Sequence, residues 1–174
     1  MIRIMILGDS GVGKTRILEA YTKGVFKENQ AATIGIDYRN KNITKQNVSL
    51  KLQIWDTAGE ERYHSITNIS VRDADAVLMV YDITQKQTFY NIKTKWVDMV
   101  HNVCKNNVIM VLVGNKTDLE GSREVSTVDA EAFAKETEMG FVETSAKELY
   151  NVDGAFDHIV EEILKQRPDL AKTS

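Results

Sequence analysis

Gly8-Asp9-Ser10-Gly11-Val12-Gly13-Lys14-Thr15 is the segment that decides the fold of this 174-residue chain. Its glycines and its Lys-Thr pair have the spacing of a phosphate-binding loop, and it lies between an apolar run and a helical pattern. The glycines allow a tight turn in which consecutive backbone N–H groups point at phosphate oxygens. We expect the residues from Asp9 to Arg16 to bind a nucleotide, with Lys14 reaching its β- and γ-phosphates. The alternative is a glycine-rich turn that carries Lys-Thr by coincidence.

The rest of the chain predicts an α/β fold of the P-loop NTPase class, with residues 1–174 forming a single domain. Short apolar or β-branched runs alternate with longer segments of helical spacing, which is typical of βαβ units around a mainly parallel sheet. The predicted strands are Ile2–Leu7, Asp37–Ile43, Val48–Trp55, Ala76–Tyr81, Val108–Gly114 and Phe141–Thr144. The predicted helices are Lys14 to about Thr22, Thr88–Val103, Thr127–Thr137 and Val152–Arg167. Together they predict a six-stranded, mostly parallel sheet flanked by about five helices.

Local signals refine this fold. Thr44-Lys45-Gln46-Asn47 separates two predicted strands by a gap that suits a hairpin, which gives one antiparallel strand in the sheet. Ser126 and Asp129 form a capping-box pattern at the start of the third helix. Because a sheet of this class binds ligands at the carboxyl ends of its strands, we expect the motifs that follow each strand to converge on one edge.

Composition excludes several classes of protein. The net charge of −3 argues against a nucleic-acid-binding protein, which usually carries a basic surplus. The single cysteine, Cys104, allows no internal disulfide, so we expect a reducing, cytoplasmic location and a packed rather than a reactive thiol. No apolar run is long enough to span a bilayer, and the apolar N-terminus reads as the first strand, not as a signal peptide.

Asn115-Lys116-Thr117-Asp118 predicts which base the nucleotide carries. A carboxylate in a pocket accepts hydrogen bonds from N1–H and the 2-amine of guanine. Adenine lacks both donors, so Asp118 would be left unsatisfied at a cost of about 1–3 kcal/mol or more. Alone, this tetrapeptide reads as a common surface turn; downstream of a phosphate loop it indicates a guanine site.

Asp56-Thr57-Ala58-Gly59 follows an apolar strand and predicts the metal site. A carboxylate at the tip of a strand suits Mg²⁺, a hard cation that prefers oxygen ligands and keeps its waters. We expect the Thr15 hydroxyl to ligate Mg²⁺ near Asp56, and Gly59 to let the backbone approach the γ-phosphate. The alternative is an ordinary aspartate that starts a turn.

With these motifs in place, the sequence resembles a Ras-superfamily small GTPase of the Rab branch, over nearly its whole length from Ile2 to about Gln166. The residues that carry the resemblance are Thr33-Ile34-Gly35-Ile36-Asp37-Tyr38, Lys51-Leu52-Gln53-Ile54-Trp55-Asp56-Thr57-Ala58-Gly59, Leu78-Met79-Val80-Tyr81-Asp82-Ile83-Thr84 and Glu143-Thr144-Ser145-Ala146-Lys147. The resemblance implies a slow GTP hydrolase that switches between GTP and GDP states.

The resemblance also assigns residues to roles. Thr33 would ligate Mg²⁺ and meet the γ-phosphate in the GTP state, and Phe26 would stack near the guanine edge. The other implied base contacts are Asn115, Lys116, Leu119, Ser145, Ala146 and Lys147. Glu60, Lys14 and Thr33 would be the catalytic residues.

Further implications concern partners. Segments 30–37 and 59–72 would be the switches read by effectors, an exchange factor and a GTPase-activating protein, and the protein would be a monomer. Ile36, Trp55 and Tyr63 would add an apolar patch beside the switches, although Trp55 fits a core position equally well. The family acts in vesicular membrane traffic at the cytosolic face of endomembranes.

Three departures from the Rab pattern bear on function. Glu60 stands where the family has a glutamine that orients the attacking water, so we predict low intrinsic hydrolysis; the alternatives are that Glu60 acts as a base or that turnover is abolished and only GTP binding remains. Residues 69–74 differ from the usual Rab segment. No cysteine follows Cys104, so the prenylated tail is absent from this chain, which is either trimmed or a soluble member. The remaining alternative is another P-loop enzyme, an ATPase or small-molecule kinase.

Overall fold

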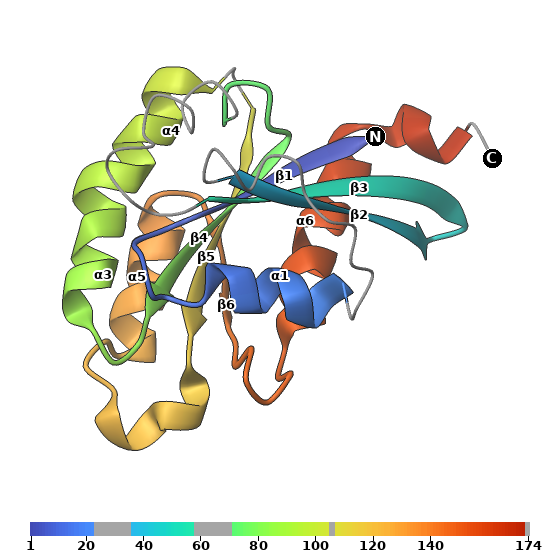
Figure 1. The fold of residues 1–174 in the computed structure, drawn as a ribbon. Helices are drawn as coiled ribbons and strands as arrows, with labels where there is room; N and C mark the ends of the chain where they lie inside the picture. Colours follow the sequence, from blue (N-terminus) through green and yellow to red (C-terminus); the bar gives the residue numbers. More distant parts are fainter. Residues whose placement is uncertain (23–35, 58–70, 105–106, 173–174) are drawn as a thin grey trace.

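Figure 1 shows the computed structural model, which describes residues 1–22, 36–57, 71–104 and 107–172. Its centre is a six-stranded sheet in the order β2-β3-β1-β4-β5-β6. Every neighbouring pair is parallel except β2 with β3. The strands are β1 (Ile2–Leu7), β2 (Ile36–Lys45), β3 (Val48–Thr57), β4 (Ala76–Asp82), β5 (Ile109–Asn115) and β6 (Gly140–Glu143). The predicted sheet is confirmed.

Helices cover both faces of this sheet (Figure 1). One face carries α1 and α6, and the other carries α3, α4 and α5, so the described residues contain five α-helical segments. The helical elements are α1 (Lys14–Thr22), α3 (Lys86–Asn91), η3 (Ile92–Trp96), α4 (Val97–Val103), η4 (Thr117–Ser122), α5 (Thr127–Glu136), α6 (Val152–Gln166) and η5 (Pro168–Lys172). This arrangement confirms the predicted α/β class.

One helix differs from its prediction. The stretch predicted as a regular helix over Thr88–Val103 is continuous from Lys86 to Val103, but its middle five residues, η3, are π-helical. The backbone N–H of Val97 donates to the carbonyl of Ile92, five residues earlier. The buried apolar residues Phe89, Ile92, Trp96 and Val100 follow one another at steps of three or four, as in a regular helix, so apolar periodicity does not reveal the π turn.

The core explains why the central strands are apolar throughout. Side chains of a strand alternate between the two faces of a sheet. In β4, Leu78 and Val80 pack beneath α1 and α6, whereas Val77 and Met79 pack beneath the helices on the other face. Because both faces are covered, β4 is apolar from Ala76 to Val80, and the whole strand is buried from end to end.

The hairpin is tighter than the sequence indicates. Strand pairing continues to the Lys45–Val48 pair, so the turn holds two residues where the sequence suggests a four-residue gap. Gln46 and Asn47 both have positive φ, 52° and 63°, as in the turns that fit the twist of two-residue hairpins. Backbone pairing also carries β3 on to Thr57, so Asp56 lies within the strand and not after it.

Strand direction places the candidate site. β1, β3, β4, β5 and β6 are parallel, so their carboxyl ends lie along one edge of the sheet. The predicted cap at Ser126 is confirmed, because its hydroxyl accepts a hydrogen bond from the backbone N–H of Asp129 at 3.1 Å. Among the described residues, no helix combines the length and the apolar character needed to cross a bilayer.

Candidate nucleotide site

The loop between β1 and α1 has a backbone that only glycine can supply. Gly13 has φ of +102°, and a Cβ atom there would lie 2.3 Å from the side-chain nitrogen of Asn115. Any larger residue would therefore be strained and would collide with Asn115 at the end of β5. The close approach ties the phosphate loop to the Asn115–Asp118 segment.

Lys14 lies in this loop as a buried cation. Its side-chain nitrogen donates to the backbone carbonyl of Asp9 at 2.7 Å, and the residue is 5% exposed. Burial lowers the pKa of Lys14, and the nearby carboxylates of Asp56 and Asp9 oppose that shift. An ammonium group inside a glycine loop, bonded to one backbone carbonyl and close to two carboxylates, is placed to meet an anionic ligand.

Two of the predicted metal-site residues lie together. The Thr15 hydroxyl donates to a carboxylate oxygen of Asp56 at 2.5 Å, although 41 residues separate them in the sequence. Asp56 is 5% exposed at the end of β3. Hydroxyl and carboxylate oxygens are the donors that a hard divalent cation prefers, so these two residues fit Mg²⁺.

Asn115 connects three segments of the site. Its side-chain nitrogen donates to the carbonyl of Val12 in the phosphate loop at 2.9 Å. Its side-chain oxygen accepts from the Thr144 hydroxyl at 2.9 Å and from the backbone N–H of Ala146 at 3.2 Å. Asn115 is 2% exposed. A buried amide that bonds to all of these segments fixes the distance between the loops after β1 and β6 and the end of β5.

Asp118 lies beside the loop after β6. One of its carboxylate oxygens accepts from the Ser145 hydroxyl at 2.8 Å, and the same hydroxyl accepts from the backbone N–H of Glu148. Ser145 is buried, whereas Asp118 is partly exposed. Because Ser145 holds one side of the carboxylate, Asp118 is oriented before any ligand arrives.

Lys116 adopts a left-handed backbone conformation, with φ of 72°, and its ammonium group lies 2.9 Å from a carboxylate oxygen of Asp82. Asp82, at the end of β4, also accepts from the Thr84 backbone and hydroxyl at 2.8 and 2.6 Å. Burial disfavours the ionised carboxyl, but the hydrogen bonds from Thr84 and Lys116 outweigh it and hold the pKa of Asp82 below its usual value. The sequence reasoning missed Asp82, although it ends a strand on the same edge.

A second missed feature joins the segments around Asp118 and Ser145. Arg123 donates to Glu143 at 2.6 and 3.3 Å, to Glu120 at 2.8 and 2.7 Å and to the carbonyl of Val125 at 2.9 Å. Glu143 ends β6, and Glu120 lies in η4, so Arg123 ties together the two loops that would enclose a base. Glu120 is a local partner, but nothing in the local sequence links Arg123 to Glu143, which lies 20 residues later and meets it only in the folded chain.

The remaining predicted site residues fall into two groups. Those at the exposed rim of the site are Ser10, Gly11, Arg16, Leu119 and Lys147. Phe26, Thr33, Gly59 and Glu60 lie outside the described residues, as does Tyr63 of the predicted apolar patch. Trp55 is partly buried on β3, stacked on Tyr38 with ring centroids 4.9 Å apart and with Arg3 5.5 Å from its ring.

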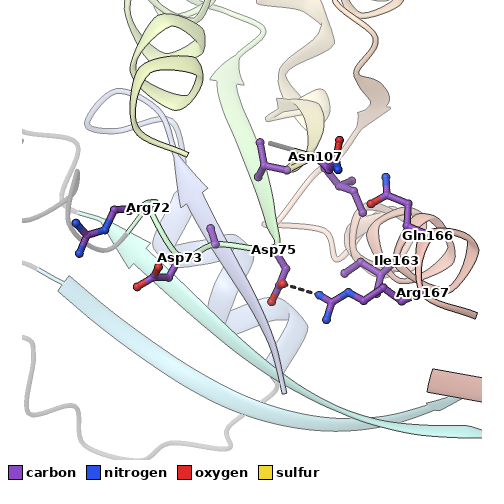
Figure 2. A pocket seen from close by; sticks show the side chains of 10 residues that line it. Arg72, Asp73, Asp75, Asn107, Ile163, Gln166 and Arg167 are labelled. Atoms are coloured by element: carbon purple, nitrogen blue, oxygen red, sulfur yellow. Dashed lines mark hydrogen bonds and ion pairs between the residues drawn. The ribbon is translucent and has the colours of Figure 1, made fainter. Parts of the chain in front are cut away.

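A separate hollow of about 740 Å³ lies at the opposite edge of the sheet, before the starts of β4 and β5 (Figure 2). The ion pair between Arg167 and Asp75, 2.5 Å long, crosses it. Asp75 also accepts from the backbone N–H of Arg3 at 2.8 Å. These bonds tie the end of α6 to the sheet, which gives the polar lining a structural role away from the phosphate loop.

Comparison with known proteins identifies the family. The model of the Ras family matches residues 3–165. Ras-related protein Rab-37 from Homo sapiens is 45% identical over 162 residues, covering 92% of this chain and 72% of the relative. GTP-binding protein ypt3 from Schizosaccharomyces pombe is 42% identical over 165 residues, covering 95% and 77%. Ras-related protein Rab-12 from Mus musculus is 42% identical over 168 residues, covering 96% and 69%.

The chain therefore belongs to the Ras family. Within that family it is a Rab-like small GTPase, a GTP-hydrolysing switch of membrane traffic. This confirms the resemblance read from the sequence, including the Rab branch.

Proposed function

We propose that this chain holds GTP or GDP together with Mg²⁺ at the carboxyl edge of its sheet and hydrolyses GTP slowly. The observation that carries the proposal is the set of bonds made by Asn115. One buried amide connects the phosphate loop at Val12 with the segment at Thr144 and Ala146. A ligand that spans these segments needs phosphates at one end and a base at the other, which describes a nucleotide.

Guanine specificity would come from Asp118. Ser145 donates to one carboxylate oxygen of Asp118, and the other oxygen would accept from donors on a ligand. Guanine offers N1–H and a 2-amine there, whereas adenine offers neither and leaves a carboxylate unsatisfied. The backbone N–H of Ala146 donates to Asn115 at 3.2 Å and would share that hydrogen with the guanine carbonyl when a nucleotide is bound.

The phosphate end would use Lys14 and Thr15. Lys14 would exchange its bond to the Asp9 carbonyl for phosphate oxygens, since the anionic ligand is a stronger partner than a neutral carbonyl. Thr15, Thr33 and, through water, Asp56 would hold Mg²⁺, which when bound neutralises charge on the β- and γ-phosphates. Lys14 would stabilise the negative charge that develops on the β-phosphate as water attacks the γ-phosphorus and GDP leaves.

A competition experiment tests this proposal. We expect GTP, but not ATP, to displace a bound fluorescent GDP analogue. We expect Asp118→Asn to shift the preference from GTP toward xanthosine triphosphate (XTP), because the amide replaces one acceptor oxygen with an NH2 donor and xanthine has a carbonyl in place of the 2-amine of guanine. Asp98→Asn, on an exposed position of α4, removes the same charge and serves as the control. Equal displacement by ATP and GTP, or an unchanged GTP-to-XTP preference in Asp118→Asn, would refute guanine recognition by this residue.

Glu60 supports a second candidate function, a GTP-binding interaction module without turnover. Glutamate can accept a hydrogen bond from the attacking water but can donate none toward the transition state, and its negative charge would be repelled by phosphate. We expect single-turnover phosphate release to be faster in Glu60→Gln than in the wild type. A slower variant would show that Glu60 acts as a base instead. No measurable release from the wild type, even with a GTPase-activating protein, would favour the interaction module.

Partner recognition would use the surface next to β2 and β3. The partly exposed Trp55, stacked on Tyr38 and faced by Arg3, offers an aromatic surface beside the predicted switch segments. The relatives are Rab proteins, which supports effector binding at the cytosolic face of an endomembrane. Nucleotide-dependent capture of one defined effector, lost in Trp55→Ala but kept in Trp55→Phe, would test this surface.

A further inference from the structure

The side chain of Asp9 is held by two donors from a helix that lies more than 80 residues later in the chain. Trp96 donates its indole N–H to one carboxylate oxygen at 2.9 Å. Asn91 donates its amide N–H to the other oxygen at 2.6 Å. Both oxygens of one carboxylate are therefore fixed by the helix that contains α3, η3 and α4, and the partner residue belongs to the phosphate loop.

The π-helical turn is what makes this double contact possible. Residues advance by about 100° each along an α-helix, so positions five apart lie about 140° apart and point in different directions. In a π turn the backbone bond joins residues five apart, as Val97 N–H does with the Ile92 carbonyl, and side chains at that spacing come onto the same side. Asn91 and Trp96 are five apart and span η3, so the widened turn brings both onto one carboxylate.

The backbone of Asp9 also contacts the key lysine of the phosphate loop. The Asp9 carbonyl is the acceptor for the Lys14 ammonium group at 2.7 Å. Trp96 is 2% exposed and fixed among the core residues beneath α3 and α5, so it is a rigid anchor. Fixing the Asp9 carboxylate therefore fixes the carbonyl that holds Lys14.

We propose that Asn91 and Trp96 are positioning residues that hold the phosphate loop in its nucleotide-retaining shape through Asp9, and that the π turn exists to bring them together. The inference rests on the proposed nucleotide site and adds a second, remote determinant of nucleotide retention. Losing one hydrogen bond to a carboxylate is expected to speed GDP release by about tenfold.

The test is an exchange of partners. Asn91→Asp places two carboxylates against each other and should speed release of a fluorescent GDP analogue by at least about tenfold. Adding Asp9→Asn restores one donor and one acceptor at the same contact, and should bring the release rate back to within about twofold of the wild type. Asn102→Asp, exposed on the same continuous helix, makes the identical chemical change away from Asp9 and should leave release unchanged.

Trp96→Phe gives a second, independent measurement because it removes the indole donor and keeps an aromatic ring. It should speed GDP release by about tenfold. The chain has two tryptophans, so Trp55→Phe leaves Trp96 as the only source of tryptophan fluorescence. In that background, we expect the emission of Trp96 to change when Asp9→Asn is added and to stay the same when Asn102→Asp is added.

Three outcomes would overturn the inference: no rescue in the exchanged pair, equal effects of Asn91→Asp and Asn102→Asp, or release from Trp96→Phe within twofold of the wild type. A wild-type protein that fails to retain GDP would instead refute the proposed function. If Asn91→Asp does not fold, the exchanged pair and Trp96→Phe still decide, because neither places two carboxylates in contact.

Discussion

Arg123→Met is the substitution for which the structure best defines the expected loss of stability. The side chain of Arg123 is 16% exposed and that of Glu143 is 18% exposed, and they are joined by hydrogen bonds of 2.6 and 3.3 Å. Methionine keeps most of the volume of the arginine stem and removes every donor. The carboxylate of Glu143 would keep one side-chain hydrogen bond, which the Thr127 hydroxyl donates at 2.8 Å.

The expected cost follows from these contacts. A hydrogen bond to a charged group contributes about 1.5–3 kcal/mol, and the shallow position of this pair places it in the lower part of that range. Losing the ion pair with Glu120 adds little to this cost, because the Glu120 side chain is 65% exposed. We therefore expect Arg123→Met to lower the free energy of unfolding by about 2 kcal/mol, which lowers Tm by about 4–8 °C for a chain of this size.

The assay is thermal unfolding followed by circular dichroism at one saturating GDP concentration, since bound ligand raises Tm by mass action. Lys165→Met is the matched control. The contact of Lys165 with Glu162 is 2.6 Å long, the same as that of Arg123 with Glu143, but Lys165 is 71% exposed, so we expect no measurable change in Tm. If both variants lower Tm equally, or if Arg123→Met lowers it by less than about 1 °C, burial does not set the strength of these pairs.

Three further outcomes are expected. Ser126→Ala removes the cap of α5 and should lower the free energy of unfolding by about 1 kcal/mol, read as a lower urea midpoint with an unchanged slope. Phe156→Leu breaks the stack on Tyr21, whose ring centroid lies 3.8 Å away, and should cost about 1–3 kcal/mol in the same assay; a midpoint equal to that of the wild type would contradict this packing. Gly13→Ala forces a Cβ to within 2.3 Å of the Asn115 amide and should weaken GDP binding by at least about tenfold in calorimetry, and unchanged affinity would show that the loop can relax.

Local chemistry explains why the fold could be predicted. A glycine loop with Lys14 and Thr15 works only between a strand and a helix, and the apolar strands that alternate with amphipathic helices admit few arrangements other than a covered parallel sheet. The strand ends then place Asn115 and Asp118 on the same edge as the phosphate loop, because parallel strands share a direction. The family resemblance depends on the same segments, and the match to the Ras family confirms it.

The side-chain contacts that hold the site together could not be predicted from the sequence. Asp9 is an ordinary loop residue until a π turn brings Asn91 and Trp96 onto its carboxylate, and hydrophobic periodicity carries no sign of such a turn. Likewise, several acidic residues lie near Arg123 in the sequence, and only the folded structure shows that Glu143, 20 residues later, is its partly buried partner.

The sequence by itself thus determined the sheet, the phosphate loop and the chemical types at the site, because propensity, periodicity and motif spacing are properties of neighbouring residues. Only the tertiary structure decided which buried donors meet which acceptors. Those choices depend on side chains from distant segments that must satisfy one another wherever water is excluded.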